Sequence, residues 1–235
     1  MKTYVWSIPL RIFHWLLAIG FASAYILADF EEYRNLHFAF GALVGSLAFM
    51  RLLFGFFGPR YAHFRDFPIG VKSQINFIKS FTDTSKTFVG HNPAASVVML
   101  GIFVVGMFTA TSGFMLYNAE YTQVLPFASS EETFEEVHEI LANLFLVLVV
   151  LHLIGLATDA AFHPKAQTLK SMISGYKNLT AEHTELNTGQ KIFTAIWLAV
   201  PIILFFVAFG LPATENESGD SQNTELHDEH EEEHE

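Results

Sequence analysis

The chain has 235 residues, about half of them hydrophobic, and 25 of them are phenylalanine. It contains no cysteine, which excludes disulfides, iron–sulfur clusters held by thiolates and thiol catalysis, and leaves histidine as the natural metal ligand. The formal net charge of −11 arises from a tail, residues 213–235, which carries ten acidic side chains and no Lys or Arg. The remaining 14 acids nearly balance the 13 bases, so the charge does not indicate nucleic-acid binding.

Five apolar stretches are each close to the ~20 residues that a helix needs to cross a bilayer. A segment in lipid must satisfy its backbone hydrogen bonds internally, so these stretches are expected to be helices. The sequence therefore predicts an all-α, multi-pass membrane protein. The predicted spans are residues 9–28, 36–57, 93–117, 134–158 and 191–211.

The basic residues predict the orientation of these spans, because Lys and Arg concentrate in cytoplasmic connections. Of the 13 basic residues, 12 fall on one side: before the first span, in the second or fourth connection, or at the ends of the spans that adjoin these segments. Only Arg34 falls in the first connection, and the third connection is acidic. We therefore expect a cytoplasmic N-terminus and, after five spans, a C-terminus on the outer side of the membrane.

The long second connection contains a short amphipathic pattern that begins at Val71 and places Ile75, Ile78 and Phe81 at helical spacing, with lysines between them. This pattern is typical of a helix that lies on the membrane surface. An ordinary loop helix explains it equally well.

Two histidines bracket the apolar run of the fourth predicted span. His138 and His152 are fourteen residues apart, and Asn143 is the single polar residue between Ile140 and Leu151. On an α-helix this spacing returns both rings to nearly the same face, about 40° apart, and separates them by roughly 21 Å along the axis. Ionisable residues inside a membrane span indicate a functional site.

The predicted orientation gives each intramembrane histidine a depth. His14 lies near the cytoplasmic end of the first span, and His37 lies near the outer end of the second. In the fourth span His138 is outer and His152 is inner. The four residues therefore form two pairs at two depths, as two haems stacked across the membrane would require if each were ligated by two histidines.

Other residues near these histidines suit the same site. Gly41 and Gly45 follow His37 at four-residue intervals and would let a flat porphyrin approach the helix, although small residues at this spacing also serve helix packing. Arg11 and Arg51 lie near the inner surface, where they would pair with haem propionates or simply anchor the spans. Three further histidines, in loops or at a helix start, are not expected to be ligands: His63, His91 and His163.

Several segments in chain order resemble the bacterial cytochrome b561 and nickel-hydrogenase b-type cytochrome family, over roughly residues 1–180. They are Pro9-Leu10-Arg11-Ile12-Phe13-His14-Trp15, His37 with Gly41, Gly58-Pro59-Arg60-Tyr61-Ala62, Gly90-His91-Asn92-Pro93, Ser112-Gly113-Phe114, His138-Glu139 and the span of His152. In that family a four-helix bundle holds b-type haems and exchanges electrons with quinone. The resemblance implies that His14, His37, His138 and His152 are the axial ligands of two haems b.

Three regions follow from this comparison: residues 1–180 as the haem-binding membrane domain, residues 181–212 with an additional fifth helix, and residues 213–235 as an acidic tail rich in His and Glu. The resemblance explains neither the fifth helix nor the tail. The tail is expected to be disordered, although it would also suit divalent metal or a basic cytochrome c.

The sequence and the resemblance thus predict a di-haem electron carrier in the bacterial inner membrane, with a periplasmic C-terminus. It would be an electron-transfer subunit rather than a stand-alone enzyme, and it would act between the quinone pool and a redox protein on the periplasmic side. That partner would be a hydrogenase, another dehydrogenase or a c-type cytochrome, and the family also includes quinone-linked oxidation of superoxide. The alternative is a metal transporter or metal-binding protein, with the histidines as a path and the tail as a collector.

Overall fold

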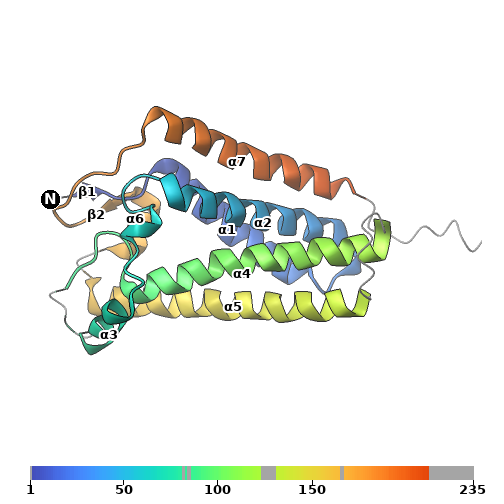
Figure 1. Cartoon of the computed structure of the whole chain (residues 1–235), viewed down its shortest axis with the longest axis horizontal. Helices are drawn as coiled ribbons and strands as arrows, with labels where there is room; N and C mark the ends of the chain where they lie inside the picture. The colour runs from blue at the N-terminus through green and yellow to red at the C-terminus, as the bar shows by residue number, and fades with distance from the viewer. Residues whose placement is uncertain (1, 81–82, 84–85, 123–130, 165–166, 212–235) are drawn as a thin grey trace, which may run out of the picture.

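The protein is described by a computed structural model, which covers residues 2–80, 83, 86–122, 131–164 and 167–211. Its five long helices run side by side along the longest axis of the molecule (Figure 1). Each is long and apolar enough to cross a membrane, which confirms the five predicted spans to within a few residues. They are α1 (Ile8–Leu27), α2 (Arg34–Phe57), α4 (Pro93–Tyr117), α5 (Glu131–Phe162) and α7 (Thr188–Phe209).

Local sequence signals fix where the long helices begin. The side chain of Asn92 accepts a hydrogen bond of 2.8 Å from the backbone N–H of Ala95, and Pro93 occupies the first turn of α4. At α7, Asn187 and Gln190 form a reciprocal capping box. These caps satisfy N–H groups that a helix start otherwise leaves without partners.

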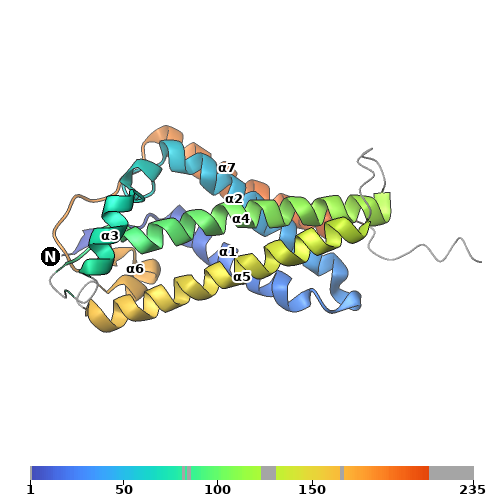
Figure 2. The same cartoon turned by 60° about the horizontal axis from the view of Figure 1, so that its bottom comes forward.

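Helix α2 lies at the centre of the bundle and packs against α1, α4 and α7. The fifth helix joins it through Trp197, which is 0% exposed and lies 5.0 Å from the ring of Phe54 and 4.7 Å from that of Phe13. Helix α5 lies beside α4, which is its main neighbour, and also contacts the short helix that follows it (Figure 2). Side chains link it to α1 as well, since the ring centroids of Phe145 and Phe21 lie 4.3 Å apart.

Helix α5 is also the longest of the five. Its 32 residues correspond to roughly 48 Å, which exceeds the ~30 Å of hydrocarbon in a bilayer. Both ends therefore extend beyond the lipid core. The acidic first turn, with Glu131 and Glu132, and the last turn around Asp159 lie in these extensions, whereas His138 and His152 fall within the central part.

Short elements gather at the end of the bundle where the N-terminus lies (Figure 1). Helix α3 (Val71–Lys79) confirms the predicted amphipathic segment as helical, and its Val71 and Ile78 are exposed. Helix α6 (Thr168–Ser174) follows α5. Strand β1 (Thr3–Tyr4) pairs antiparallel with β2 (Tyr176–Lys177), and this two-stranded ribbon joins the N-terminus to the segment after α6.

At the opposite end, single turns complete the helices. A 3-10 turn, η1 (Glu31–Tyr33), precedes α2, and a π-helical turn, η3 (Asn118–Thr122), follows α4. Arg34 joins them, with Nη1 2.5 Å from a carboxylate oxygen of Glu120 and 2.8 Å from the hydroxyl of Tyr121. Another 3-10 turn, η2 (Phe64–Asp66), follows α2 at the ribbon end. The predicted acidic tail, residues 213–235, lies outside the described residues.

Candidate functional site

The four intramembrane histidines meet in the two pairs that the depth argument predicted. The rings of His14 on α1 and His152 on α5 have centroids 6.5 Å apart, and we call these residues the first pair. The rings of His37 on α2 and His138 on α5 have centroids 6.1 Å apart and form the second pair. The first pair lies toward the ribbon end of the bundle, and α5 contributes one member to each.

The spacing within each pair suits a single metal between two imidazoles. Two metal–nitrogen bonds of about 2 Å, plus about 1.2 Å from each coordinating nitrogen to its ring centre, place the centroids about 6.4 Å apart. The observed values of 6.5 and 6.1 Å lie close to this. Space for a flat group beside such a metal is present at the first pair, where both histidines line a cavity.

Hydrogen bonds orient both rings of the second pair. Nδ1 of His37 lies 2.8 Å from the carbonyl oxygen of Ala24, and Nδ1 of His138 lies 3.0 Å from that of Thr109 and 3.1 Å from the hydroxyl of Ser112. A ring that donates through Nδ1 to a carbonyl keeps its lone pair on Nε2, the nitrogen then available to a metal. Gly113 is close behind His138, since a Cβ there would lie 2.9 Å from the ring.

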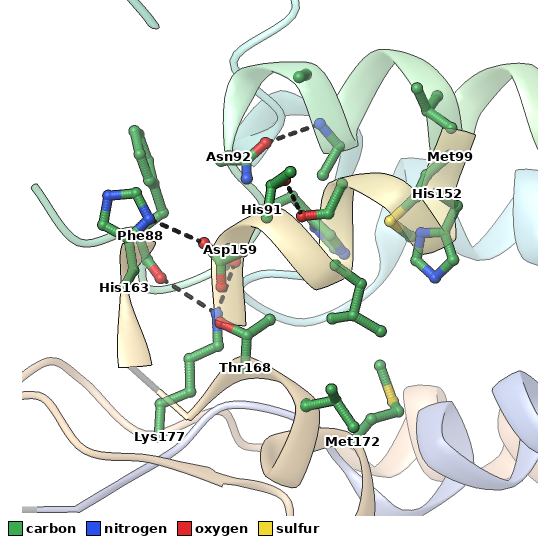
Figure 3. A pocket seen from close by; sticks show the side chains of 18 of the residues that line it. Phe88, His91, Asn92, Met99, His152, Asp159, His163, Thr168, Met172 and Lys177 are labelled. Carbon is green, nitrogen blue, oxygen red and sulfur yellow. Dashed lines mark hydrogen bonds and ion pairs between the residues drawn. The ribbon is translucent and has the colours of Figure 1, made fainter. Parts of the chain in front are cut away.

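The first pair opens into a cavity of about 230 Å³ at the ribbon end of the bundle (Figure 3). The part of the cavity near His152 is lined by apolar side chains, including Met99 and Met172. Nδ1 of His14 is buried and has no hydrogen-bond partner among the described residues. A buried imidazole nitrogen beside an apolar cavity is the surrounding that a porphyrin ligand needs, so the residues present fit a haem.

The two glycines predicted to admit a porphyrin differ in their surroundings. A Cβ at Gly41 would meet no atom within 4 Å, so this face of α2 is open one turn after His37. A Cβ at Gly45 would lie 2.2 Å from the Cβ of Ala110, so Gly45 permits close packing of α2 on α4. Gly41 thus retains its predicted role, whereas the contact of Gly45 supports the helix-packing interpretation.

The two arginines predicted near propionates also differ. Arg11 donates a hydrogen bond to the carbonyl of Ile173, at the edge of α6. Arg51 is buried inside the bundle, where Nη2 donates to the carbonyl of Ala62 at 3.0 Å and the guanidinium lies 5.1 Å from the centroid of the Phe103 ring. Arg51 does not line the cavity of the first pair, so its role toward a propionate stays a prediction.

A layer of side chains separates the two pairs in the middle of the bundle. Phe145 of α5 is 2% exposed, and its ring centroid lies 4.3 Å from that of Phe21 on α1. Beside it, the hydroxyl of Tyr25 donates to the side-chain oxygen of Asn143 at 3.1 Å. The single polar residue of the apolar run therefore links α1 to α5 between the two histidine levels.

Four polar residues at the ribbon end of the cavity were not predicted as site residues: His91, Asp159, His163 and Lys177. Burial, followed by the charges of Arg51, Lys177 and His152, holds the pKa of His91 well below its ordinary value. Asp159 lies in the last turn of α5 and His163 directly follows this helix, with Oδ1 and Nδ1 3.5 Å apart. Their i,i+4 spacing was a signal available in the sequence, whereas nothing local marks Lys177.

Comparisons of the sequence with known proteins all indicate b-type cytochromes. A family model described as prokaryotic cytochrome b561 matches residues 5–175. The probable Ni/Fe-hydrogenase 1 B-type cytochrome subunit of Escherichia coli K12 is 29% identical over 153 residues, which cover 53% of this chain and 64% of that relative. The chain thus spans less than two thirds of that relative's length.

More distant relatives are matched over more of their length. The probable Ni/Fe-hydrogenase B-type cytochrome subunit of Azotobacter vinelandii is 22% identical, with 74% of this chain and 88% of the relative covered. The subunit of the same name from Rhodobacter capsulatus is 20% identical, with 78% and 84% covered. No solved structure matches the chain significantly.

Proposed function

Because the chain belongs to the prokaryotic cytochrome b561 family, we propose that it is a membrane electron carrier with two b-type haems, one at each histidine pair. His14 and His152 ligate the first haem, and His37 and His138 ligate the second. The observation that carries this proposal is the ring spacing of 6.5 and 6.1 Å within the pairs. When bound, haem iron supplies the one-electron oxidation and reduction.

Residues of the chain determine the positions of the two iron sites and the orientation of their ligands. Helix α5 holds one ligand of each pair, so it fixes the separation of the two iron sites. The carbonyls of Ala24 and Thr109 hold the rings of His37 and His138 in one tautomer and orientation, which strengthens both as ligands. Phe145 and Phe21 fill the layer between the sites and exclude water from it.

The partners of this electron transfer follow from the relatives and from the charge pattern. The matched relatives are named as cytochrome subunits of Ni/Fe-hydrogenases, which supports a hydrogenase-type partner for this chain. We place the N-terminus in the cytoplasm, because 12 of the 13 basic residues would then face the cytoplasm. We place the redox partner on the opposite, periplasmic side. Quinone in the membrane is the other electron partner.

The alternative of a metal transporter uses the histidines as a path and the tail as a collector, and the tail lies outside the described residues. Within the described part of the chain, no three His, Asp or Glu side chains converge as a metal centre requires. The haem proposal accounts for both histidine pairs and for the open space beside Gly41, so it explains more of the molecule.

The purified protein tests the proposal directly. We expect a reduced-minus-oxidised spectrum of b type and two haems per chain. Replacement of His14 or His152 by alanine should remove the same haem, and replacement of His37 or His138 should remove the other. As a control, His63→Ala should keep both, since His63 lies in a loop and accepts a hydrogen bond from the N–H of Arg65.

Two results would contradict the proposal. A colourless protein that binds divalent metal with full occupancy would exclude the cytochrome function. Loss of one and the same haem from His14→Ala and His138→Ala would exclude the assigned ligand pairs.

A further inference from the structure

The cavity beside the first pair has a cationic end. Lys177 lines this cavity together with His14 and His152, and it is only 2% exposed (Figure 3). Its ammonium group donates hydrogen bonds to the carbonyl oxygens of Phe88 at 3.2 Å and Gly90 at 3.0 Å. An ammonium group has three N–H donors, so a third remains for an occupant of the cavity.

No carboxylate balances this charge at close range. In the described part of the chain, no Asp or Glu oxygen lies within 4 Å of the Lys177 nitrogen. Asp159 lines the same end of the cavity and attracts Lys177 from farther away, while its Oδ1 lies 3.5 Å from Nδ1 of His163. A buried charge without a close counter-ion is costly, so an anion bound in the cavity would complete this end of the site. Burial lowers the pKa of Lys177 to about 8, and the attraction of Asp159 partly opposes this shift, so the group is largely charged at neutral pH.

The fold holds Lys177 in place through the ribbon. Lys177 pairs with Thr3 across the two strands, and the N–H groups of Val5 and Trp6 donate to the carbonyl of Gly175 at 2.8 and 3.1 Å. Gly175 adopts φ +87°, and a Cβ there would lie 2.6 Å from the ring of Tyr4, so only glycine suits the position. The side chain of Lys177 is thus presented to the cavity from a fixed backbone.

The indole of Trp6 forms the wall beside the lysine. The Lys177 nitrogen lies 5.6 Å from its ring centroid, and the indole N–H donates to the hydroxyl of Ser171 at 3.0 Å. A cavity with imidazoles and apolar side chains at one end and a fixed ammonium at the other matches a molecule with an apolar plane and an anionic edge. Haem has this character, since its two carboxylates lie on one edge of the porphyrin.

We propose that Lys177 binds a propionate carboxylate of the haem held by His14 and His152. This inference rests on the proposed function, because it requires a haem at the first pair. The lysine and the carboxylate neutralise each other in a buried setting, where a charge-assisted hydrogen bond is strong. The ribbon is then a cofactor-binding element, and the N-terminal residues Thr3–Trp6 belong to the haem site.

The test compares Lys177→Met with Lys170→Met, which removes an exposed lysine from neighbouring α6. We expect Lys177→Met to release the first haem roughly tenfold faster, the effect of one hydrogen bond between charged groups. The midpoint potential of that haem should become more negative, because a nearby positive charge favours the reduced form. The release rate and midpoint potential of the second haem should match those in the parent protein. In Lys170→Met, both haems should match the parent protein in these two properties. If Lys177→Met does not accumulate, Lys177→Gln replaces it.

Iron protoporphyrin dimethyl ester identifies the group that the lysine binds. With native haem, the ratio of release rates between Lys177→Met and the parent protein should be about ten. With the ester, which lacks the carboxylates, the ratio should fall to about one. A ratio that stays near ten with the ester, or near one with native haem, would overturn the inference while two-haem binding by the parent protein still supports the proposed function.

Discussion

At the scale of single residues, the two histidine pairs differ in the hydrogen bonds that their rings make. Each ring of the second pair has a carbonyl partner, whereas Nδ1 of His14 has no hydrogen-bond partner among the described residues. A ligand that donates a hydrogen bond is a stronger electron donor to iron, so the two proposed haems are expected to differ in potential. Lys177 adds a further difference, because its charge lies at the first site alone.

Lys177 also predicts a pH dependence in the haem-free protein. Its pKa falls from 10.5 to about 8 on folding, so below pH 8 both states are protonated and the cost of burial is present in full. Between about pH 8 and 10.5 the folded state releases a proton that the unfolded state keeps, so the free energy of unfolding should rise with pH, by up to about 3 kcal/mol. Thermal unfolding of the parent protein and Lys177→Met over this window measures the difference, and equal slopes would contradict the shift.

Gly41 and Gly45 provide a second contrast between residues one turn apart. Gly41→Leu should cost little stability, since its side chain enters open space, but it should remove most of the haem at the second pair. Gly45→Ala should instead lower the free energy of unfolding by about 1–3 kcal/mol, because its Cβ would overlap Ala110. Haem content and chemical denaturation together separate the two effects. Equal haem loss in both variants would argue against an opening at Gly41.

At the scale of the elements, hydropathy was sufficient to predict the long helices, because lipid leaves the backbone no other way to satisfy its hydrogen bonds. The predicted span 93–117 coincides with α4, and the predicted span 134–158 falls inside the longer α5. The ends of α5 could not be predicted from hydropathy, because they extend past the lipid.

The pairing of the four histidines was predictable from the sequence, whereas their surroundings were not. Depth along the spans was enough to pair the four histidines. The burial of Arg51, the buried position of His91 and the ribbon that carries Lys177 depend on contacts between residues far apart in sequence. No periodic pattern records such contacts, so a residue like Lys177 has the same appearance in sequence as any basic residue of a cytoplasmic loop.

The fifth helix makes a prediction of its own. Trp197 is fully buried between α7 and α2, and its indole N–H lies 3.4 Å from the carbonyl of Leu47. Trp197→Ala should lower stability by about 3–5 kcal/mol, while the spectra of both haems stay unchanged because α7 supplies no ligand. Ile203→Ala, on the exposed face of α7, is the matched control. A shifted haem spectrum in a stable Trp197→Ala protein would assign α7 a direct part in the site.

At the scale of the whole molecule, the charge pattern and the ribbon lie at one end. Helices α3 and α6 gather there (Figure 1), and the first pair shares a cavity with Lys177 of the ribbon. Arg34 at the start of α2 and Glu120 after α4 lie at the opposite end and pair with each other. The proposed orientation therefore places the first haem toward the cytoplasm and the second toward the periplasm.

Because the chain has no cysteine, single cysteines report this orientation without background. We expect a maleimide that cannot cross membranes to label Glu132→Cys in intact spheroplasts. It should label Lys72→Cys only after the membrane is permeabilised. Both positions are exposed, so access depends on the side of the membrane alone. The reverse labelling pattern would invert the molecule and exchange the sides of the two haems.

The fourteen-residue spacing of His138 and His152 on one helix has an electrical consequence. About 21 Å of the ~30 Å hydrocarbon lies between the two levels, so an electron that passes between the haems crosses most of the membrane's electric field. A charge that crosses the whole field changes its free energy by ~2.3 kcal/mol for each 100 mV of membrane potential. The free energy of this electron transfer should therefore change by roughly 1.6 kcal/mol for each 100 mV. An inside-negative voltage would therefore hold electrons on the periplasmic haem, and the energised state of the membrane would control how readily they reach the cytoplasmic side.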